Sequence, residues 1–86
     1  MYEVNYASGV EKDVRKLPKD VLKQCLDRIE RLLKANPFSG EKLKFNKMEL
    51  YRYRVRDYRI VYTVNTKLRT VTIYKIRHRR EVYRDL

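Results

Sequence analysis

The segment Leu50–Val64, LYRYRVRDYRIVYTV, carries the strongest structural signal in the chain. Tyr51, Tyr53 and Val55 are separated by single arginines, a period that places all three on one face of a β-strand. Asp57 interrupts the alternation and indicates a turn into a second strand. The segment therefore predicts an antiparallel hairpin with one apolar face and one face of guanidinium groups.

Shorter patterns on either side extend this hairpin to four strands. Tyr2–Tyr6, YEVNY, alternates large apolar residues with polar ones, which is typical of a half-buried strand. The second strand of the hairpin is expected over residues 58–64, and residues 65–67, Asn-Thr-Lys, predict the next turn. A last strand is expected over residues 70–76, so residues 50–76 form a three-stranded meander.

Two helices are expected between the first strand and this meander. Ser8 with Glu11 three residues later matches a capping box at the start of the first helix. Pro18 ends that helix. The second helix is expected over Lys19–Lys34, where apolar residues recur at i, i+4, i+8 and i+11.

The segment between the second helix and Leu50 is expected to be a loop, because Asn36-Pro37 stops the helix and Gly40 favours a turn. The order is then strand, two helices and three strands. It predicts an α+β fold in which a helical hairpin packs on a mostly antiparallel four-stranded sheet. Residues 79–86 are expected to form a short tail or a last helical turn.

The 86 residues fit a single domain, expected to span residues 1–86. No apolar run approaches the ~20 residues that cross a bilayer, and the start of the chain lacks an apolar signal core. A cytoplasmic protein without a membrane partner is therefore expected. The only cysteine, Cys25, excludes an internal disulfide and a Cys-based zinc finger. Asp57, Glu81 and Asp85 are too scattered for a metal site.

The net charge of +11 is concentrated in the second part of the chain. Residues 50–86 contain nine arginines and two lysines against three acidic residues, whereas residues 1–49 are nearly balanced. Arginine binds phosphate through a planar fork of donors and stacks on bases, which lysine does not do. The partner is therefore expected to be a polyanion or an acidic protein.

The strand period places Arg52, Arg54 and Arg56 on one side of the sheet, about 7 Å apart. Arg59 on the next strand is expected to lie beside them, and further arginines follow the last strand. Such like charges repel, so stability alone does not favour the arrangement. An anion site that binds RNA is one interpretation, and an ordinary solvated face of an antiparallel sheet is the other.

Three motifs together resemble the RelE toxins of prokaryotic toxin–antitoxin pairs, within the RelE/ParE superfamily. They are LLKANPFSGEKLK at residues 32–44, LYRYRVRDYRIVYTV at 50–64 and IRHRREVYR at 76–84. The resemblance implies an endoribonuclease that cleaves messenger RNA on the ribosome, without a metal or other cofactor. In such enzymes the ribose 2′-hydroxyl attacks the adjacent phosphate. The resemblance also implies inhibition by a RelB-like antitoxin with acidic or amphipathic helices. Contact with DNA would be made only through a complex with this antitoxin.

The same motifs imply which residues act. The residues matching the catalytic positions are Arg52, Arg54, Arg59, either Arg77 or Arg79, and Tyr83. Arg59 would bind the phosphate, Arg52 and Arg54 would orient the RNA backbone, and Arg77 or Arg79 would stabilise the leaving 5′-oxygen. Tyr83 would stack on a base or assist proton transfer. Further RNA contacts are expected from Lys44, Arg56, His78 and Arg80.

Two points stay open at the level of sequence. Arginine is a poor general base because its pKa exceeds ~12, so the proton acceptor is Tyr83, His78 or neither. Arg56 and Arg77 stand where relatives often have glycine. The alternative functions are a ParE-like inhibitor of DNA gyrase and a basic RNA-binding module without activity, although no RNP-like motif is present.

Overall fold

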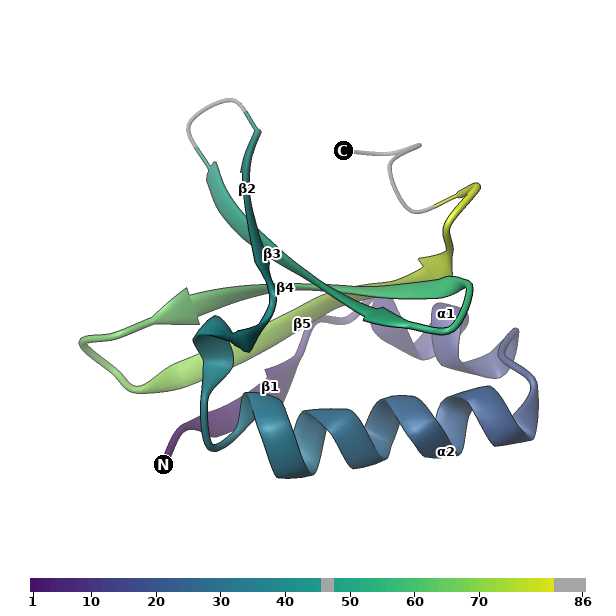
Figure 1. The fold of residues 1–86 in the computed structure, drawn as a ribbon, viewed down its shortest axis with the longest axis horizontal. Coiled ribbons are helices and arrows are strands. Elements are labelled where there is room, and N and C mark those ends of the chain that lie inside the picture. The colour runs from purple at the N-terminus through teal and green to yellow at the C-terminus, as the bar shows by residue number, and fades with distance from the viewer. Residues whose placement is uncertain (46–47, 82–86) are drawn as a thin grey trace.

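The computed structural model describes residues 1–45 and 48–81. They form one mixed sheet with helices packed on one of its faces (Figure 1). The elements, in chain order, are β1 Glu3–Tyr6, α1 Val10–Arg15, α2 Lys19–Arg28, a π-helical turn η1 Ile29–Leu33, a 3₁₀ turn η2 Pro37–Ser39, β2 Glu41–Phe45, β3 Met48–Val55, β4 Tyr58–Asn65 and β5 Thr70–His78.

The sheet has the order β1-β5-β4-β3-β2, in which β2 to β5 are antiparallel and β1 is parallel to β5. The expected α+β fold is confirmed, with five strands rather than four. The additional strand, β2, lies in the segment expected to be a loop. It is stabilised by tertiary contacts, because Leu43 pairs with Leu50 and both pack with Val61 on the face away from the helices.

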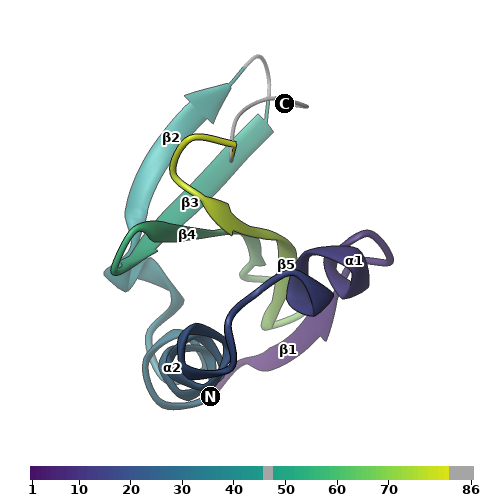
Figure 2. The same ribbon diagram turned by 90° about the vertical axis from the view of Figure 1, so that its right-hand side faces the viewer.

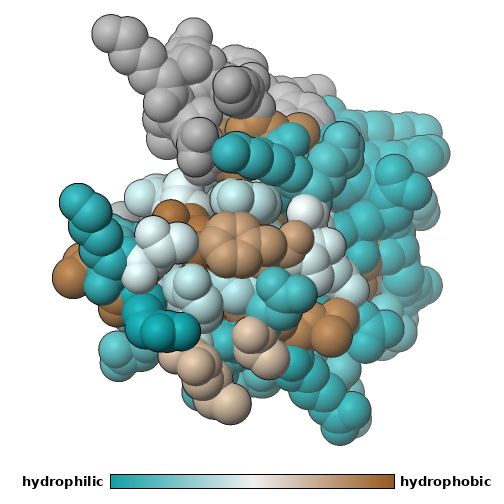
Figure 3. All heavy atoms as spheres, turned by 60° about the vertical axis from the view of Figure 1, so that its left-hand side comes forward, coloured by the Kyte–Doolittle hydropathy of each residue, from teal (hydrophilic) through white to brown (hydrophobic). Residues whose placement is uncertain are grey.

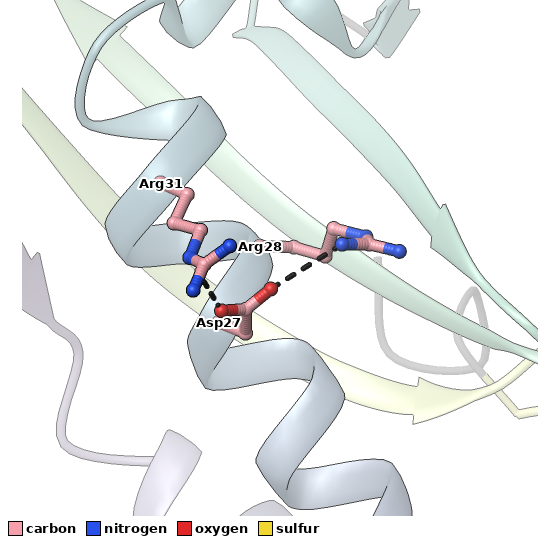
Figure 4. Close-up of polar contacts among 3 residues, drawn as sticks. All are labelled: Asp27, Arg28 and Arg31. Atoms are coloured by element: carbon pink, nitrogen blue, oxygen red, sulfur yellow. Dashed lines mark hydrogen bonds and ion pairs between the residues drawn. The ribbon is translucent and has the colours of Figure 1, made fainter.

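The second helix follows its predicted boundaries closely, since α2 continues into η1 up to Leu33. Its buried residues, Val21, Cys25, Ile29 and Leu33, are spaced four apart and form one stripe against the sheet. On the other side of this helix, Asp27 forms ion pairs with Arg28 and Arg31 (Figure 4).

The predicted capping box of the first helix is wrong. The helix begins at Val10 after Gly9, and no side chain caps it. Glu11 instead lies inside the first turn, where it forms an ion pair with Arg15 one turn further on, at 2.7 Å. A carboxylate used in this way is not available to the amide of Ser8.

The apolar face of the predicted hairpin lies in the core. Tyr51, Val55, Ile60 and Tyr62 pack under the helices with the apolar residues of β5. A β-bulge shifts the register of β4 and β5 between Val61 and Tyr62. Because of this extra residue, β5 keeps both of its inward isoleucines, Ile73 and Ile76, in the core although they are three positions apart.

The buried Tyr62 hydroxyl fixes the corner between η2 and β2. It donates a hydrogen bond to the Pro37 carbonyl at 2.6 Å and accepts one from the Gly40 amide at 3.2 Å. Burial raises the pKa of Tyr62 to about 12. The hydroxyl therefore stays protonated and keeps both bonds at neutral pH.

Aromatic contacts lead from this corner to the surface. Tyr62 stacks on Tyr51, Phe38 packs edge-on against Tyr51, and Tyr2 packs edge-on against Phe38. Phe38 is 48% exposed. Figure 3 shows hydrophobic side chains that reach the surface among hydrophilic ones, on the side of the molecule that is at the left in Figure 1.

In the end-on view of Figure 2, α2 lies below β3 and β4, α1 lies beside β5, and β2 and β3 rise away from both helices. The other face of the sheet is therefore not covered by these helices. No helix in residues 1–45 and 48–81 is long and apolar enough to cross a membrane.

Candidate nucleic-acid interface

Three arginines lie side by side on β3, β4 and β5, at the end of the sheet next to the β3–β4 turn. Arg54 on β3 is the direct partner of Arg59 on β4, and Arg59 is the direct partner of Arg77 on β5. Residues paired in this way share one face of a sheet, and the neighbouring core residues show that this face is the one opposite the helices. We call Arg54, Arg59 and Arg77 the arginine row. Arg52 lies two residues before Arg54 and faces the same side.

Arg59, in the middle of the row, is held rather than solvated. It is only 8% exposed, and its Nη1 donates hydrogen bonds to the carbonyls of Tyr58 and Arg56 at 2.9 and 3.1 Å. The side chain of Arg59, on β4, is thus held by a carbonyl of the β3–β4 turn that precedes it. A guanidinium fixed in this way loses little further entropy when it meets an anion.

Arg77, at one end of the row, forms an ion pair with a buried carboxylate. Its Nε donates a hydrogen bond to Oδ1 of Asp13 at 3.0 Å. Oδ2 of Asp13 accepts a second hydrogen bond, from the backbone amide of Ile76, at 3.2 Å. Asp13 is 6% exposed and lies on α1. Asp13 was not among the site residues expected from the sequence. The available signal was its position, three residues after Val10 and four before Leu17, inside the apolar stripe of the helix.

Arg52 forms an ion pair with Glu41, the residue beside it on β2. Hydrogen bonding to Arg52, with a further contribution from the charge of Arg54, holds the pKa of Glu41 below its usual range. The side chain of Glu41 is 61% exposed, so this pair is open to solvent. Gly40, Arg52 and Arg54 line a pocket of about 310 Å³ at this place.

Arg56 does not lie with Arg52 and Arg54, contrary to the expectation from the strand period. It belongs to the two-residue turn after β3 and has a φ of 56°, a conformation that favours glycine. Its side chain forms an ion pair with Asp20 of α2 at 2.7 Å, on the side of the helices. This pair raises the pKa of Arg56 and lowers that of Asp20.

His78 also lies away from the arginine row. It is the direct partner of Tyr58 across β4 and β5, and the two rings pack edge-on with their centroids 5.4 Å apart. Its Nδ1 accepts a hydrogen bond from the backbone amide of Arg80 at 3.2 Å. Tyr58 packs against the core on the helix side. His78 and Arg77 line a cavity of about 630 Å³ between α1 and the end of β5.

The remaining candidates lie at the ends of these elements. Arg79 and Arg80 are exposed in the turn after β5, where the Arg79 amide donates to the Asp57 carbonyl at 2.8 Å. Lys44 belongs to β2, and Tyr83 lies outside the described residues. In the part of the chain that the structure describes, no three His, Cys, Asp or Glu side chains are grouped in a way that would hold a metal ion.

Comparison with known families decides what kind of protein carries this face. The family model described as the ParE toxin of type II toxin–antitoxin systems, parDE, matches residues 4–83. The chain belongs to this family of toxins. A relative named RelE1 toxin, from Methanocaldococcus jannaschii, is 33% identical over 88 residues, which cover 98% of this chain and 97% of the relative. The chain is therefore a toxin of the RelE/ParE superfamily.

Solved structures show the same fold. The archaeal RelE–RelB complex from Pyrococcus horikoshii OT3 contains a chain 32% identical to this toxin, with a TM-score of 0.69 over 91% of this chain and 94% of that one. The RelBE2 toxin–antitoxin complex from Mycobacterium tuberculosis contains a chain with a TM-score of 0.82 and 24% identity, over 90% of this toxin and 96% of that chain. The second likeness concerns the fold alone.

Proposed function

We propose that this toxin is an endoribonuclease that cleaves messenger RNA on the ribosome. The observation that carries the proposal is the arginine row, whose three residues are direct partners on adjacent strands. The motifs that resemble RelE, and the relative named RelE1 toxin, favour RNA as the substrate. A ParE-like action on DNA gyrase is the alternative suggested by the family model.

In the proposed reaction the ribose 2′-oxygen forms a bond to the neighbouring phosphorus, and the bond from phosphorus to the 5′-oxygen breaks. The 2′-hydroxyl loses its proton and the leaving 5′-oxygen gains one, so the products are a 2′,3′-cyclic phosphate and a 5′-hydroxyl. The ribosome would hold the message in the geometry for in-line attack, which is a positioning effect. The toxin then adds positive charge where negative charge grows in the transition state.

Each arginine has a separate role in this proposal. Arg59 stabilises the charge on the phosphate, and Arg52 and Arg54 bind and orient the RNA backbone. Arg77 rather than Arg79 stabilises the leaving 5′-oxygen, because Arg77 is the direct neighbour of Arg59 whereas Arg79 follows the end of β5. Tyr83 stacks on a base or assists proton transfer, a role that rests on its motif.

The proposed partner in the cell is an antitoxin of the RelB kind. The toxins in the two solved structures above occur in complexes, RelE with RelB and RelBE2. A net charge of +11 favours a partner with acidic segments. Amphipathic or acidic helices that bind over the sheet and the helical layer would prevent RNA from reaching the arginines.

The decisive experiment maps the 5′ ends of messenger RNA after incubation with translating ribosomes and purified toxin. We expect cuts within reading frames at a fixed position in the codon, 5′-hydroxyl ends, and at least a hundredfold slower cleavage of the same RNA without ribosomes. Double-strand breaks in DNA that depend on gyrase would instead support the ParE-like action. Binding of RNA with neither activity would reduce the protein to a binding module.

The exposed Glu41 competes with phosphate for Arg52, which leads to a prediction. Glu41→Gln should tighten binding to a single-stranded RNA about twofold to fivefold, the range of one surface ion pair. The measurement is the dissociation constant from fluorescence anisotropy at fixed salt. Glu30→Gln is the matched control, because Glu30 pairs with Lys34 at the end of the helical layer and its loss changes the net charge equally. An equal gain in both variants would contradict a specific role of Glu41.

A further inference from the structure

Asp13 is a charged residue in a place where a small domain rarely keeps one. It is 6% exposed, belongs to α1, which packs against β5, and lines the cavity between these two elements together with Arg77. A buried carboxylate is costly unless its oxygens are paired. Here both oxygens have partners, the Ile76 amide and the Arg77 guanidinium. The carboxylate is therefore a fixed part of the structure.

The bond to Ile76 closes a gap in the sheet. β1 pairs with β5 only as far as Ile73, so within residues 1–45 and 48–81 no strand pairs with the outer edge of β5 from residue 74 onward. α1 lies along this edge. Asp13 accepts a hydrogen bond from the backbone amide of Ile76, which in a longer sheet would be donated to the carbonyl of a neighbouring strand. The same carboxylate therefore ties the helix to the strand and reaches the next side chain along the strand, Arg77.

The bond to Arg77 fixes the guanidinium beside two like charges. Arg59 is its direct partner, and Arg54 follows in the same row. Without a counter-charge, repulsion within the row and the rotamer freedom of a long side chain would both move Arg77 away. Asp13 binds at Nε, near the base of the guanidinium, so it orients the planar group.

Asp13 differs from Glu41, which is also paired with an arginine of this face. Glu41 is mostly exposed, and an incoming phosphate can replace it at Arg52. Asp13 is buried and also accepts a hydrogen bond from a backbone amide, so we expect the Asp13–Arg77 pair to persist when RNA binds.

We infer that Asp13 is a positioning residue, which holds Arg77 in the orientation that stabilises the leaving oxygen. This inference rests on the proposed ribonuclease function. If the inference holds, α1 affects the rate of cleavage although it does not belong to the face that is proposed to bind RNA.

The test is a double-mutant cycle with Asp13→Asn, Arg77→Ala and the combination, measured as single-turnover cleavage on saturating ribosome complexes. Asp13→Asn keeps an acceptor for Ile76 but places an uncharged amide beside Arg77. We expect it to lower the rate constant about tenfold, with little change in the concentration for half-saturation. In the Arg77→Ala background the same change should cost less than twofold, because Asp13 acts through Arg77. Glu11→Gln, an exposed acidic residue of the same helix, should leave the rate unchanged.

The outcomes separate the inference from the function on which it rests. A wild-type toxin that does not cleave RNA on ribosomes overturns both. Cleavage by the wild type with equal losses from Asp13→Asn in the two backgrounds overturns the inference alone, since it indicates a purely structural role. If Asp13→Asn does not fold, Arg77→Lys replaces it: this variant keeps the charge but not the guanidinium Nε, and a rate equal to that of the wild type would contradict the inference.

Discussion

Arg59→Ala should reduce cleavage of ribosome-bound messenger RNA about 10²-fold to 10³-fold. This is the size of effect expected when one preorganised donor is removed from the developing charge of a transition state. Arg59 lies in the middle of the arginine row, and its bonds to the carbonyls of Arg56 and Tyr58 orient it without cancelling its charge. The measurement is the single-turnover rate constant on ribosome complexes.

The fold should survive this change. The two carbonyls released by Arg59→Ala are those of Arg56, in the β3–β4 turn, and Tyr58, at the start of β4, so we expect the free energy of unfolding to fall by about 1–3 kcal/mol. Arg59→Lys keeps the positive charge but loses the guanidinium that donates to both carbonyls. We therefore expect its rate constant to lie between those of Arg59→Ala and the wild type. Arg31→Ala is the matched control, since Arg31 is exposed on the helical layer and pairs with Asp27 (Figure 4). A folded Arg59→Ala protein with the rate of the Arg31→Ala control would refute the assigned role.

Gly40→Ala should lower the free energy of unfolding by about 2–3 kcal/mol, although the change adds a single methyl group. A Cβ at this position would meet the Tyr62 hydroxyl and, at 2.8 Å, the backbone carbonyl of Arg52. Neither is the flexible end of a side chain: Tyr62 is bonded to Pro37 and Gly40, and Arg52 is in the middle of β3. For a domain of this size the loss corresponds to a decrease of about 10–20 °C in the unfolding temperature.

Circular dichroism during heating measures this effect, and the other glycine supplies the control. Gly9 has a φ of −72° and a ψ of −17°, and nothing lies within 4 Å of a Cβ built there. Gly9→Ala should therefore change the unfolding temperature by only a few degrees. If the two variants unfold at the same temperature, crowding at the η2–β2 corner is not what requires glycine at position 40.

Much of the fold could be predicted from local patterns. The period of two in residues 50–64 predicted β3 and β4 and which of their faces is buried, since alternation is a property of a strand itself. The four-residue spacing in residues 21–33 predicted the second helix for the same reason. β2 was not predicted, because a short charged segment becomes a strand only where a neighbouring edge pairs with it.

The candidate site divides in the same way. The period placed Arg52 and Arg54 together, and Arg59 was expected beside them. The register then makes Arg77, and not Arg79, the direct partner of Arg59. The same period was misleading for Arg56, because a turn with a positive φ directs that side chain toward α2. Asp13 and Glu41 could not be assigned to their arginines, as Asp13 is 64 positions from Arg77 in the chain.

The sequence by itself determined that the chain is a small α+β domain with a basic, arginine-rich face, because period and composition are local properties that every strand and helix expresses alone. Only the tertiary structure decided which arginines stand in one row, and that Asp13 holds Arg77 while two backbone carbonyls hold Arg59. Pairing register and the packing of α1 on the edge of β5 are long-range choices, made by the burial of the whole core rather than by any one segment.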